Sequence, residues 1–481
     1  MCHTGILWAE ETLPLAAAGQ MLGGKALYRD IWFDKPPLLA AFYLLWGARA
    51  GWLLRLAGSL YSWAACWIAY GFARDLWSET EGFWAAGLLG FFLVFDLPSS
   101  VIPLASDLLM LAPHMAAVWL AYRNRPFASG SAAGLAFLVS PKGLLVAAVG
   151  ALWNPAGVIP MAAGFMAIGG AAAAWLLAGG ALAPYWEEVW RWGRIYAGGT
   201  FVAEPLRNGV VRTLDWLGFH AALVMAAEPF VRGLKSAKDA IALESKLSLS
   251  RGKVAPPPFW IRWAGWAIIS FAGVAAGWRF FPRYYFELLP VLTLAAARGM
   301  VLWAPRLRWR VLVFLLIPLI RFGAQYARLA DDAIRGRESQ WSDTAMDRDS
   351  RAAAALTRQL AHAEDTLFVW GFRPELYVYT GLPAATPFLD SQPLTGVPAD
   401  RHLTQSVPVE IEGSRERRAE LAQSRPTFVL DGLGLYNPQL ALANYPDLRV
   451  WLDNYREVAR SGQTVVYRLR PAPIGRPLDA P

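Results

Sequence analysis

Charged residues are scarce in this sequence: Asp, Glu, Lys and Arg make up 17% of its 481 residues, against 56% hydrophobic residues. Soluble domains carry about 25% charged residues, so this deficit argues against a wholly soluble protein. No charged residue occurs between Gly143 and Trp186, a run far longer than the ~20 residues with which a helix crosses the hydrocarbon of a membrane. The sequence therefore predicts a polytopic integral membrane protein.

Cysteines and clustered basic residues are also lacking. The two cysteines, Cys2 and Cys66, suggest no disulfide, and no spacing typical of a zinc site occurs. A net charge of +8 could indicate a nucleic-acid partner, but the 45 basic residues are scattered over loops instead of forming a stripe. Loop charges that orient a membrane protein explain them better. We therefore expect membrane lipids, and no nucleic acid, as partners.

Hydrophobicity and charge divide the chain into three regions. Residues 1–54 mix charged residues with apolar stretches, as expected for a first outer loop with juxtamembrane helices. Residues 55–322 predict a transmembrane helical domain of about ten spans. These spans are predicted at 55–74, 82–97, 101–122, 127–140, 142–153, 157–181, 213–231, 259–280, 284–303 and 309–322.

The basic residues orient the predicted spans. If the first loop lies outside, basic residues gather in three inside loops, as the positive-inside rule requires. These loops carry Arg123 and Arg125, six basic residues from Arg232 to Lys253, and Arg306 with Arg308. The inside loop 75–81 is acidic, but acidic residues carry little weight in this rule. The sequence thus predicts that residues 323–481 lie outside the membrane.

Residues 323–481 differ in character from the spans, because charges of both signs become dense there. Short apolar runs predict buried strands, and longer segments of mixed polarity predict amphipathic helices. The strands are predicted at Thr366–Trp370, Thr427–Leu430 and Thr464–Leu469, and the helices at 345–363 and 414–424. The fold class that follows is a mainly α helical membrane bundle with a C-terminal soluble α/β domain. This domain contains neither a glycine-rich phosphate loop nor a metal-binding motif.

Carboxylates stand out at the predicted outer face. Glu10 and Glu11 lie in the first outer loop, and Asp107 opens the outer end of span 101–122. A carboxylate at membrane depth is costly unless it is paired or solvated, so Asp107 is a candidate functional residue. An acid in the first turn of a helix, where it complements the helix dipole, is an equally good explanation.

Basic residues occur near the same face. Lys35 precedes two prolines, Lys142 follows a proline, and Arg283 precedes Tyr284 and a second tyrosine. Lysine provides a point charge that suits phosphate. The commoner explanation for a lone lysine is that it reaches from a helix end to the membrane interface, and arginine with tyrosines also forms interfacial belts.

Three further ionisable residues lie inside predicted spans. His114 and His220 are expected to be packed, hydrogen-bonded core residues rather than ligands. Glu287 is expected to pair with Arg279 or Arg283, because both precede it closely in the sequence.

Together these features resemble a known pattern. An acidic pair is followed by Y-R-D-x-x-x-D-K-P-P at residues 28–37, an Asp in the second outer loop, a later K-G and an outer R-Y-Y. This order is similar to the GT-C superfamily of integral membrane glycosyltransferases. The likeness is greatest to bacterial family 39-type enzymes and to lipid A aminoarabinose transferases, which depend on polyprenyl-phosphate sugars. It covers about residues 8–320.

The resemblance implies catalytic roles for three carboxylates. Glu10 matches the catalytic carboxylate of the family and Glu11 the residue beside it. The family usually has Asp–Glu where this chain has Glu10–Glu11, so the candidate base is one methylene longer here. Asp107 matches an Asp near the reaction centre.

The resemblance also implies a site for the donor phosphate, made by Lys35, Lys142, Arg283 and Tyr284. No cofactor is firmly implied. A divalent metal is left open with Asp34 as its candidate ligand, since some aminoarabinose transferases bind zinc through a Glu at this place and a His. No His partner is evident here.

The function implied is an inverting hexosyl- or pentosyltransferase of the GT-C type. It would move a sugar from a polyprenyl-phosphate donor to a lipid, glycan or protein of the cell envelope. Its site and its C-terminal domain would face the periplasm from a bacterial inner membrane.

Two other functions compete with this one. In a membrane transporter or a flippase for lipid-linked sugars, the same carboxylates would bind ions or substrate. Such proteins tend to show repeats and interrupted helices, whereas we find no repeat and the polar residues gather at one face. A protein whose spans only anchor the soluble domain would leave the first-loop residues unexplained.

The start of the chain differs from the superfamily pattern, in which a transmembrane helix precedes the acidic pair. Only the seven residues Met1–Leu7 precede Trp8, and their ~10 Å of helix cannot cross about 30 Å of hydrocarbon. Either the reading frame begins further upstream, which we favour, or this protein has dispensed with that helix. We also expect that Met1–Leu7 is loosely held and that span 55–74 lacks a packing neighbour on one side.

Overall fold

The structure is a computed structural model that describes residues 3–95, 97, 101–198, 204–234, 258–397 and 407–471. Its chain forms two compact units. The helical unit comprises Met1–Gly5, Phe33–Trp46 and Gly51–Ser339, and the C-terminal unit comprises Ile6–Trp32, Gly47–Ala50 and Gln340–Pro481. Much of the basic inside loop predicted between Arg232 and Lys253 lies outside the described residues.

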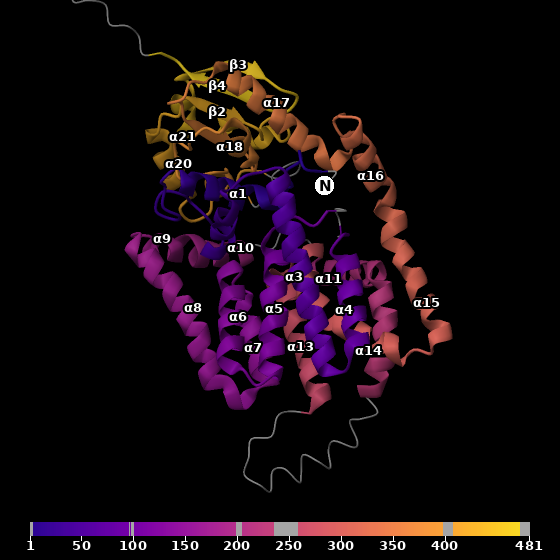
Figure 1. Ribbon diagram of the computed structural model, residues 1–481. Coiled ribbons are helices and arrows are strands. Elements are labelled where there is room, and N and C mark those ends of the chain that lie inside the picture. The colour runs from indigo at the N-terminus through magenta and orange to yellow at the C-terminus, as the bar shows by residue number, and fades with distance from the viewer. Residues whose placement is uncertain are drawn as a thin grey trace, which may run out of the picture. The chain divides into compact units, whose positions relative to one another are not determined.

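The helical unit consists of helices, because apolar segments must satisfy their backbone hydrogen bonds within each segment (Figure 1). Its α-helices are α2 (Pro37–Ala41), α3 (Trp52–Leu76), α4 (Glu79–Phe92), α5 (Ser106–Tyr122), α6 (Pro126–Val139), α7 (Gly143–Trp153), α8 (Val158–Ala178), α9 (Leu182–Tyr185), α10 (Trp192–Gly198), α11 (Pro205–Phe219), Ala221–Leu234, α13 (Phe259–Ala275), α14 (Leu289–Leu302), α15 (Arg308–Leu312) and α16 (Leu316–Ile334). The other helical segments include the 3-10 helices η1 (Phe42–Trp46) and η5 (Pro282–Leu288) and the π-helix η3 (Trp186–Arg191).

Local sequence explains several helix ends and one close packing. The Ser78 hydroxyl caps α4 by accepting the Thr80 backbone N–H. Proline opens both α6 and α11, where its missing N–H is not needed. Between α6 and α8, a Cβ on Gly130 would lie 1.8 Å from the Met161 carbonyl oxygen, and a Cβ on Gly164 would lie 2.0 Å from that of Phe127. These glycines therefore allow the two backbones to touch.

Three described helical stretches are long and apolar enough to cross a membrane: Pro155–Ala178, Phe259–Trp278 and Pro282–Leu302. The pair Pro205–Phe219 and Ala221–Leu234, bent by 89°, would be a fourth. These stretches identify a multi-pass membrane protein. Each predicted span overlaps a helix of the structure, but the number of crossings stays a prediction.

The C-terminal unit contains a four-stranded mixed sheet in the order β1-β2-β4-β3, with β1 and β2 parallel and the other neighbours antiparallel. Its strands are β1 (Leu367–Trp370), β2 (Phe428–Asp431), β3 (Tyr455–Arg460) and β4 (Val465–Leu469). Its main helices are α1 (Ala9–Leu22), α17 (Ala345–Leu360), α18 (Glu375–Thr380), α19 (Gln392–Thr395), α20 (Ser414–Gln423) and α21 (Pro446–Leu452). The predicted α/β character of this region is confirmed. Of the described strands, β3 was not predicted, because it is a largely exposed edge strand with few apolar residues. The helices α18, α19 and α21 were not predicted either.

The structure divides the chain differently from the three predicted regions. The break falls between Ser339 and Gln340 instead of near residue 323, because α16 continues as one helix to Ile334. Residues Ile6–Trp32, predicted within the first outer loop, belong to the C-terminal unit. The backbone N–H of Trp32, for example, donates to the Pro387 carbonyl oxygen at 2.9 Å.

Candidate active site

The acidic pair opens helix α1, and the structure separates its two members. The Glu11 side chain is fully buried, and its Oε1 accepts the backbone N–H of Trp8 at 2.9 Å. This contact caps one of the N–H groups that the first helical turn leaves unsatisfied. Glu10, by contrast, is exposed. Glu11 is therefore used in the helix start, whereas the Glu10 carboxylate is accessible to other molecules.

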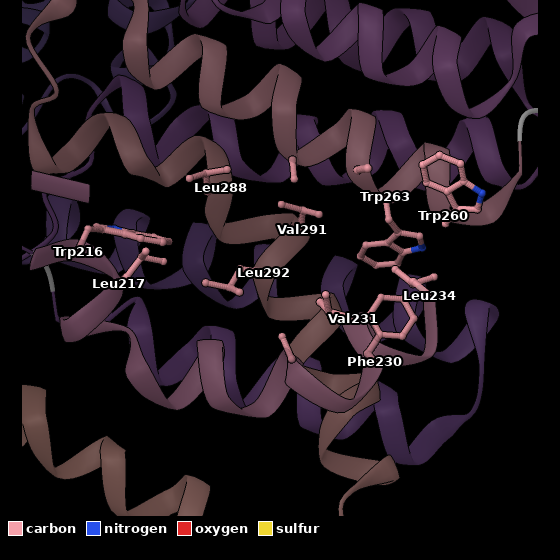
Figure 2. A pocket seen from close by; sticks show the side chains of 14 residues that line it. Trp216, Leu217, Phe230, Val231, Leu234, Trp260, Trp263, Leu288, Val291 and Leu292 are labelled. Atoms are coloured by element: carbon pink, nitrogen blue, oxygen red, sulfur yellow. The ribbon is translucent and has the colours of Figure 1, made fainter. Parts of the chain in front are cut away.

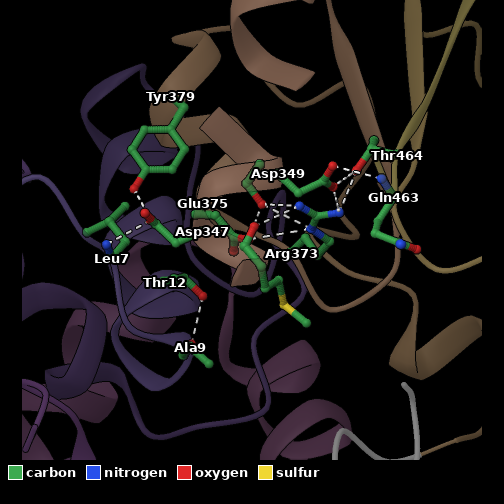
Figure 3. Close-up of polar contacts among 12 residues, drawn as sticks. Leu7, Ala9, Thr12, Asp347, Asp349, Arg373, Glu375, Tyr379, Gln463 and Thr464 are labelled. Atoms are coloured by element: carbon green, nitrogen blue, oxygen red, sulfur yellow. Dashed lines mark hydrogen bonds and ion pairs between the residues drawn. The ribbon is translucent and has the colours of Figure 1, made fainter. Parts of the chain in front are cut away.

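Helix α1 is anchored at both ends within the C-terminal unit. Before its start, the backbone N–H of Leu7 donates to Asp347 Oδ1 at 2.9 Å, and the Tyr379 hydroxyl donates to the same oxygen (Figure 3). Near its end, Gln20 Oε1 accepts the N–H of Ala384 at 2.8 Å. The loose attachment expected for Met1–Leu7 is thus not found at Leu7, because a buried carboxylate and the surrounding core hold it.

A buried ionic network stabilises the same unit. Arg373 is fully buried and donates to Asp349 Oδ2 at 2.7 Å, to the Met346 carbonyl oxygen at 3.0 Å, and to the hydroxyls of Ser350 and Thr464 (Figure 3). Burial alone would raise the pKa of Asp349, but Arg373 and hydrogen bonds to the carboxylate outweigh burial and hold that pKa below its ordinary value. The network joins α17 to the residues that precede β4.

In the helical unit, Lys142 meets a carboxylate and an aromatic ring from η5. Lys142 Nζ lies 3.8 Å from Glu287 Oε1 and 3.9 Å from the centre of the Tyr284 ring. Nζ is buried and has no hydrogen-bond partner among the described residues. The expectation that Glu287 pairs with Arg279 or Arg283 is therefore corrected. The bend before η5 turns Glu287 into the bundle, towards the N-terminus of α7.

Helix α5 contributes two more polar residues to this cluster. Asp107, half-buried in its first turn, lies close enough to act electrostatically on Glu287. His114, two turns further on, is buried. Its Nδ1 atom lies 3.9 Å from Glu287 Oε2, and its Nε2 atom accepts the indole N–H of Trp266 at 2.9 Å. His114 is thus a packed, hydrogen-bonded residue, as predicted, but it packs inside the candidate site.

Lys35 forms an ion pair with the neighbouring Asp34, whose second oxygen, Oδ1, is buried without a hydrogen-bond partner in the described part of the chain. The loop that carries both is fixed by η3, because Glu188 Oε2 accepts the N–H of Phe33 at 2.7 Å. Among the described residues, no group of three His, Cys, Asp or Glu side chains could hold a metal ion. Asp34 is therefore not part of a complete metal site within those residues.

Arg279 and Arg283 take separate positions near η5. Arg279 is buried, stacks 3.7 Å from the centre of the Tyr196 ring and donates to the Tyr196 carbonyl oxygen at 2.6 Å. Arg283 is half-buried on η5, next to Tyr284. Arg279 thus joins two helical segments, whereas Arg283 belongs to the same 3-10 helix as Tyr284 and Glu287.

An apolar cavity of about 510 Å³ lies in the helical unit (Figure 2). Trp216 and Leu217 line it towards one end, Phe230 and Trp260 towards the other, and Leu288 and Leu292 between them (Figure 2). Because Leu288 directly follows Glu287 in η5, one helical turn carries both a residue of the polar cluster and a residue of the cavity wall. A long apolar chain with an anionic head group matches both features.

The sequence-predicted residues thus fall into three sets. Asp107, Lys142 and Tyr284 lie around Glu287 in the helical unit, with Arg283 on the same turn. Lys35 is paired with Asp34 on the loop before α2 of the same unit. Glu10 and Glu11 belong to the C-terminal unit. Sequence reasoning noted Glu287 but gave it no part in the site, although a lone carboxylate in an apolar span was a sufficient signal.

No protein-family model matches this chain, and no curated protein matches it in sequence. Its fold is nevertheless shared with solved structures. ArnT from Cupriavidus metallidurans bound to undecaprenyl phosphate aligns with 97% of this chain and 95% of its own, at 14% identity and a TM-score of 0.55. The apo state of the same protein aligns with 95% and 93%, at 14% identity and a TM-score of 0.53.

A weaker overlap exists with the Archaeoglobus fulgidus oligosaccharyltransferase in complex with Zn and sulfate. It has a TM-score of 0.47 and 14% identity, and covers 94% of this chain and 67% of that one. The alignments with ArnT show that this chain shares the fold of that protein, with a helical bundle followed by a C-terminal α/β region.

Proposed function

We propose that this protein is an inverting glycosyltransferase that uses a polyprenyl-phosphate-linked sugar as its donor. The observation that carries the proposal is the buried Lys142 Nζ beside Glu287, because the residue after Glu287, Leu288, lines the apolar cavity. Lys142 Nζ has no hydrogen-bond partner among the described residues, so its N–H groups can bind a phosphate. The cavity can take isoprenoid units of the lipid. The solved complex of ArnT with undecaprenyl phosphate supports this class of donor.

The phosphate is the leaving group of the proposed reaction. A carboxylate takes the proton of the acceptor hydroxyl or amine, whose oxygen or nitrogen then attacks the anomeric carbon. The bond from that carbon to the phosphate oxygen breaks, and its electron pair stays on the polyprenyl phosphate. Lys142, assisted by Arg283 and Lys35, stabilises the charge that develops there. Attack opposite the leaving group inverts the anomeric carbon.

We assign the general base to Glu10, following the resemblance, because it is exposed while Glu11 is buried as a helix cap. Asp107 is the second carboxylate of the reaction centre and Tyr284 packs against the cation that binds the donor. General-base catalysis contributes about 10²–10⁴-fold to a rate. The transferred sugar is a hexose or a pentose, and the acceptor is a lipid, glycan or protein at the periplasmic face of a bacterial inner membrane.

A transporter or flippase for lipid-linked sugars is the second candidate. It would also need a cation next to an apolar cavity, but it would not need a general base. Replacing Glu10 therefore separates the two functions, since transport does not require proton abstraction from an acceptor.

The test is transfer by purified protein with a defined polyprenyl-phosphate sugar. Glu10→Gln and Asp107→Asn keep the shape of each side chain and remove its charge, so each should lower the rate by about 10²–10⁴-fold. The exposed Glu79 at the start of α4 provides the matched control, and Glu79→Gln should transfer at the wild-type rate. Near-normal rates in both site variants would contradict the mechanism. Mass analysis of glycolipids and glycans from cells with and without the gene would identify the sugar and acceptor.

A further inference from the structure

Glu287 is a buried carboxylate that the proposed reaction does not use. Its side chain is 3% exposed, and each of its two oxygens faces a different partner: Oε1 lies 3.8 Å from Lys142 Nζ, and Oε2 lies 3.9 Å from His114 Nδ1. Gly273 of α13 lies beside it: a Cβ there would be in ordinary van der Waals contact with Glu287 Cγ at 3.5 Å and in tight contact with Leu145 Cδ1 at 3.0 Å. A buried carboxylate costs several kcal/mol of desolvation, so its retention calls for a function.

Trp266 determines which face of His114 meets this carboxylate. The indole N–H of Trp266 can only donate, so His114 Nε2, at 2.9 Å, must accept. The proton of a neutral imidazole then resides on Nδ1, which faces Glu287. Trp266 thus orients His114 so that its Nδ1–H group faces Glu287 Oε2, and this favours a fixed position of the Glu287 carboxylate.

Both contacts of Glu287 are longer than hydrogen bonds, which reach about 3.2 Å. At 3.8 Å a carboxylate still attracts an ammonium strongly where water is excluded. It does not, however, occupy any of the ammonium N–H groups. Tyr284 adds attraction through its ring face and also leaves these N–H groups unused. Lys142 is therefore surrounded by groups that stabilise its charge without forming hydrogen bonds to it.

We propose that Glu287 is the counter-ion and positioning residue of Lys142, which keeps the ammonium charged and in place until a lipid phosphate takes its N–H groups. The inference rests on the proposed function for the identity of the ligand. Without the carboxylate, a buried lysine favours its neutral form, which binds phosphate poorly. If the Glu287 carboxylate accepted hydrogen bonds from the Lys142 ammonium, the phosphate would have to displace that carboxylate in order to bind.

Other charged groups lie around η5. Asp107 and His114 from α5 and Lys142 before α7 act on Glu287, and Arg212 of α11 acts on Tyr285; Arg283 belongs to η5 itself. The charged residues of α13 and α14, Arg262 and Arg298, are in other surroundings: Arg298 pairs with Glu81 and Arg262 lies near Tyr122. Lys142 is the cation nearest to Glu287.

The test measures binding of undecaprenyl phosphate, without sugar, to full-length protein in detergent between about pH 6 and pH 10, a range in which lysines in proteins titrate. Glu287→Gln should lose binding at a lower alkaline pH than the wild type, because the carboxylate that stabilises the ammonium is gone. At the acidic end of the range, the affinity of Glu287→Gln for undecaprenyl phosphate should equal or exceed that of the wild type, because no carboxylate competes with the phosphate for Lys142.

Two further variants make the test specific. Lys142→Arg combined with Glu287→Gln should show no alkaline loss, since a guanidinium stays charged throughout this range. Glu287→Asp keeps the charge, so its binding profile against pH should stay close to that of the wild type. If Glu287→Gln does not fold, Glu287→Asp replaces it in the test. An unchanged pH profile in Glu287→Gln, or equal weakening at every pH, would overturn the inference and leave the proposed donor intact. A wild type that does not bind the lipid phosphate would instead overturn the donor, and this inference with it.

Discussion

Lys142 in the helical unit and Arg373 in the C-terminal unit both lie beside buried carboxylates, yet they are bonded very differently. The guanidinium of Arg373 is fully buried and donates to carboxylate, hydroxyl and backbone acceptors on α17 and before β4. Lys142 Nζ is held by a carboxylate at 3.8 Å and by a tyrosine ring, and it has no hydrogen bond within the described residues.

This difference separates a structural ion pair from one that is ready to bind. A buried charge whose donors are all used stabilises its own surroundings and has nothing to offer a ligand. A buried charge with unused donors is costly in the unliganded protein, and such residues concentrate at functional sites. We therefore propose that Arg373 stabilises the fold and that Lys142 binds a ligand, and replacement of each residue tests its role.

The largest expected effect on stability is that of Arg373→Met. It leaves Asp349 and Glu375 buried without their cation, and breaking a buried pair costs about 3–5 kcal/mol. Hydrogen exchange of peptides from β1 and β4 in the full-length protein should accelerate strongly. Unchanged protection in both strands would show that the network does not stabilise this unit.

Lys142→Met should affect ligand binding rather than folding. Loss of one charge-assisted contact weakens binding of undecaprenyl phosphate by about 10–100-fold, the equivalent of 1.5–3 kcal/mol. The melting temperature should fall less than in Arg373→Met, because Lys142 Nζ makes no hydrogen bond among the described residues that the replacement could remove. A large fall in melting temperature with unchanged affinity would reverse the roles given to Lys142 and Arg373.

Acid should weaken the Arg373 network in a predictable direction. The pKa of Asp349 lies below its ordinary value in the folded protein, so Asp349 stabilises the fold above the unfolded-chain pKa of about 3.9. This stabilisation is lost as the pH falls below that value. Unfolding of the C-terminal unit, followed by tryptophan fluorescence, should therefore become easier below about pH 4, and Asp349→Asn should show a flatter pH dependence there. An equally steep dependence in the variant would exclude Asp349 as the cause.

The smallest effect is expected for Arg460→Met, which serves as the matched control for Arg373→Met. Arg460 pairs with Glu457 within β3 at 2.9 Å, but both side chains are nearly half exposed. Exposed pairs contribute about 0–1 kcal/mol. Exchange in β1 and β4 should therefore resemble the wild type, and a loss as large as that of Arg373→Met would remove the distinction between buried and exposed pairs.

The sequence predicts local structure here better than it predicts partners. The helices and three of the strands follow from apolar runs and their periodicity, and Asp107 and Lys142 follow from charge at the ends of apolar helices. The partner of Glu287 could not be predicted, because Lys142 lies far from it in the chain and the nearby arginines were the obvious candidates. The packing of α1 with the C-terminal unit likewise depends on contacts, such as Gln20 with Ala384, that leave no local pattern.

The most direct measurement compares undecaprenyl phosphate with undecaprenol, the same chain without phosphate, in native mass spectrometry of the wild type and Lys142→Met. If the helical unit binds a lipid phosphate through Lys142 and the apolar cavity, the wild type prefers the phosphate by at least about tenfold, which corresponds to one charge-assisted hydrogen bond. Lys142→Met should then bind the two lipids alike. Equal binding of both lipids by the wild type, or an undiminished preference in Lys142→Met, would contradict this function.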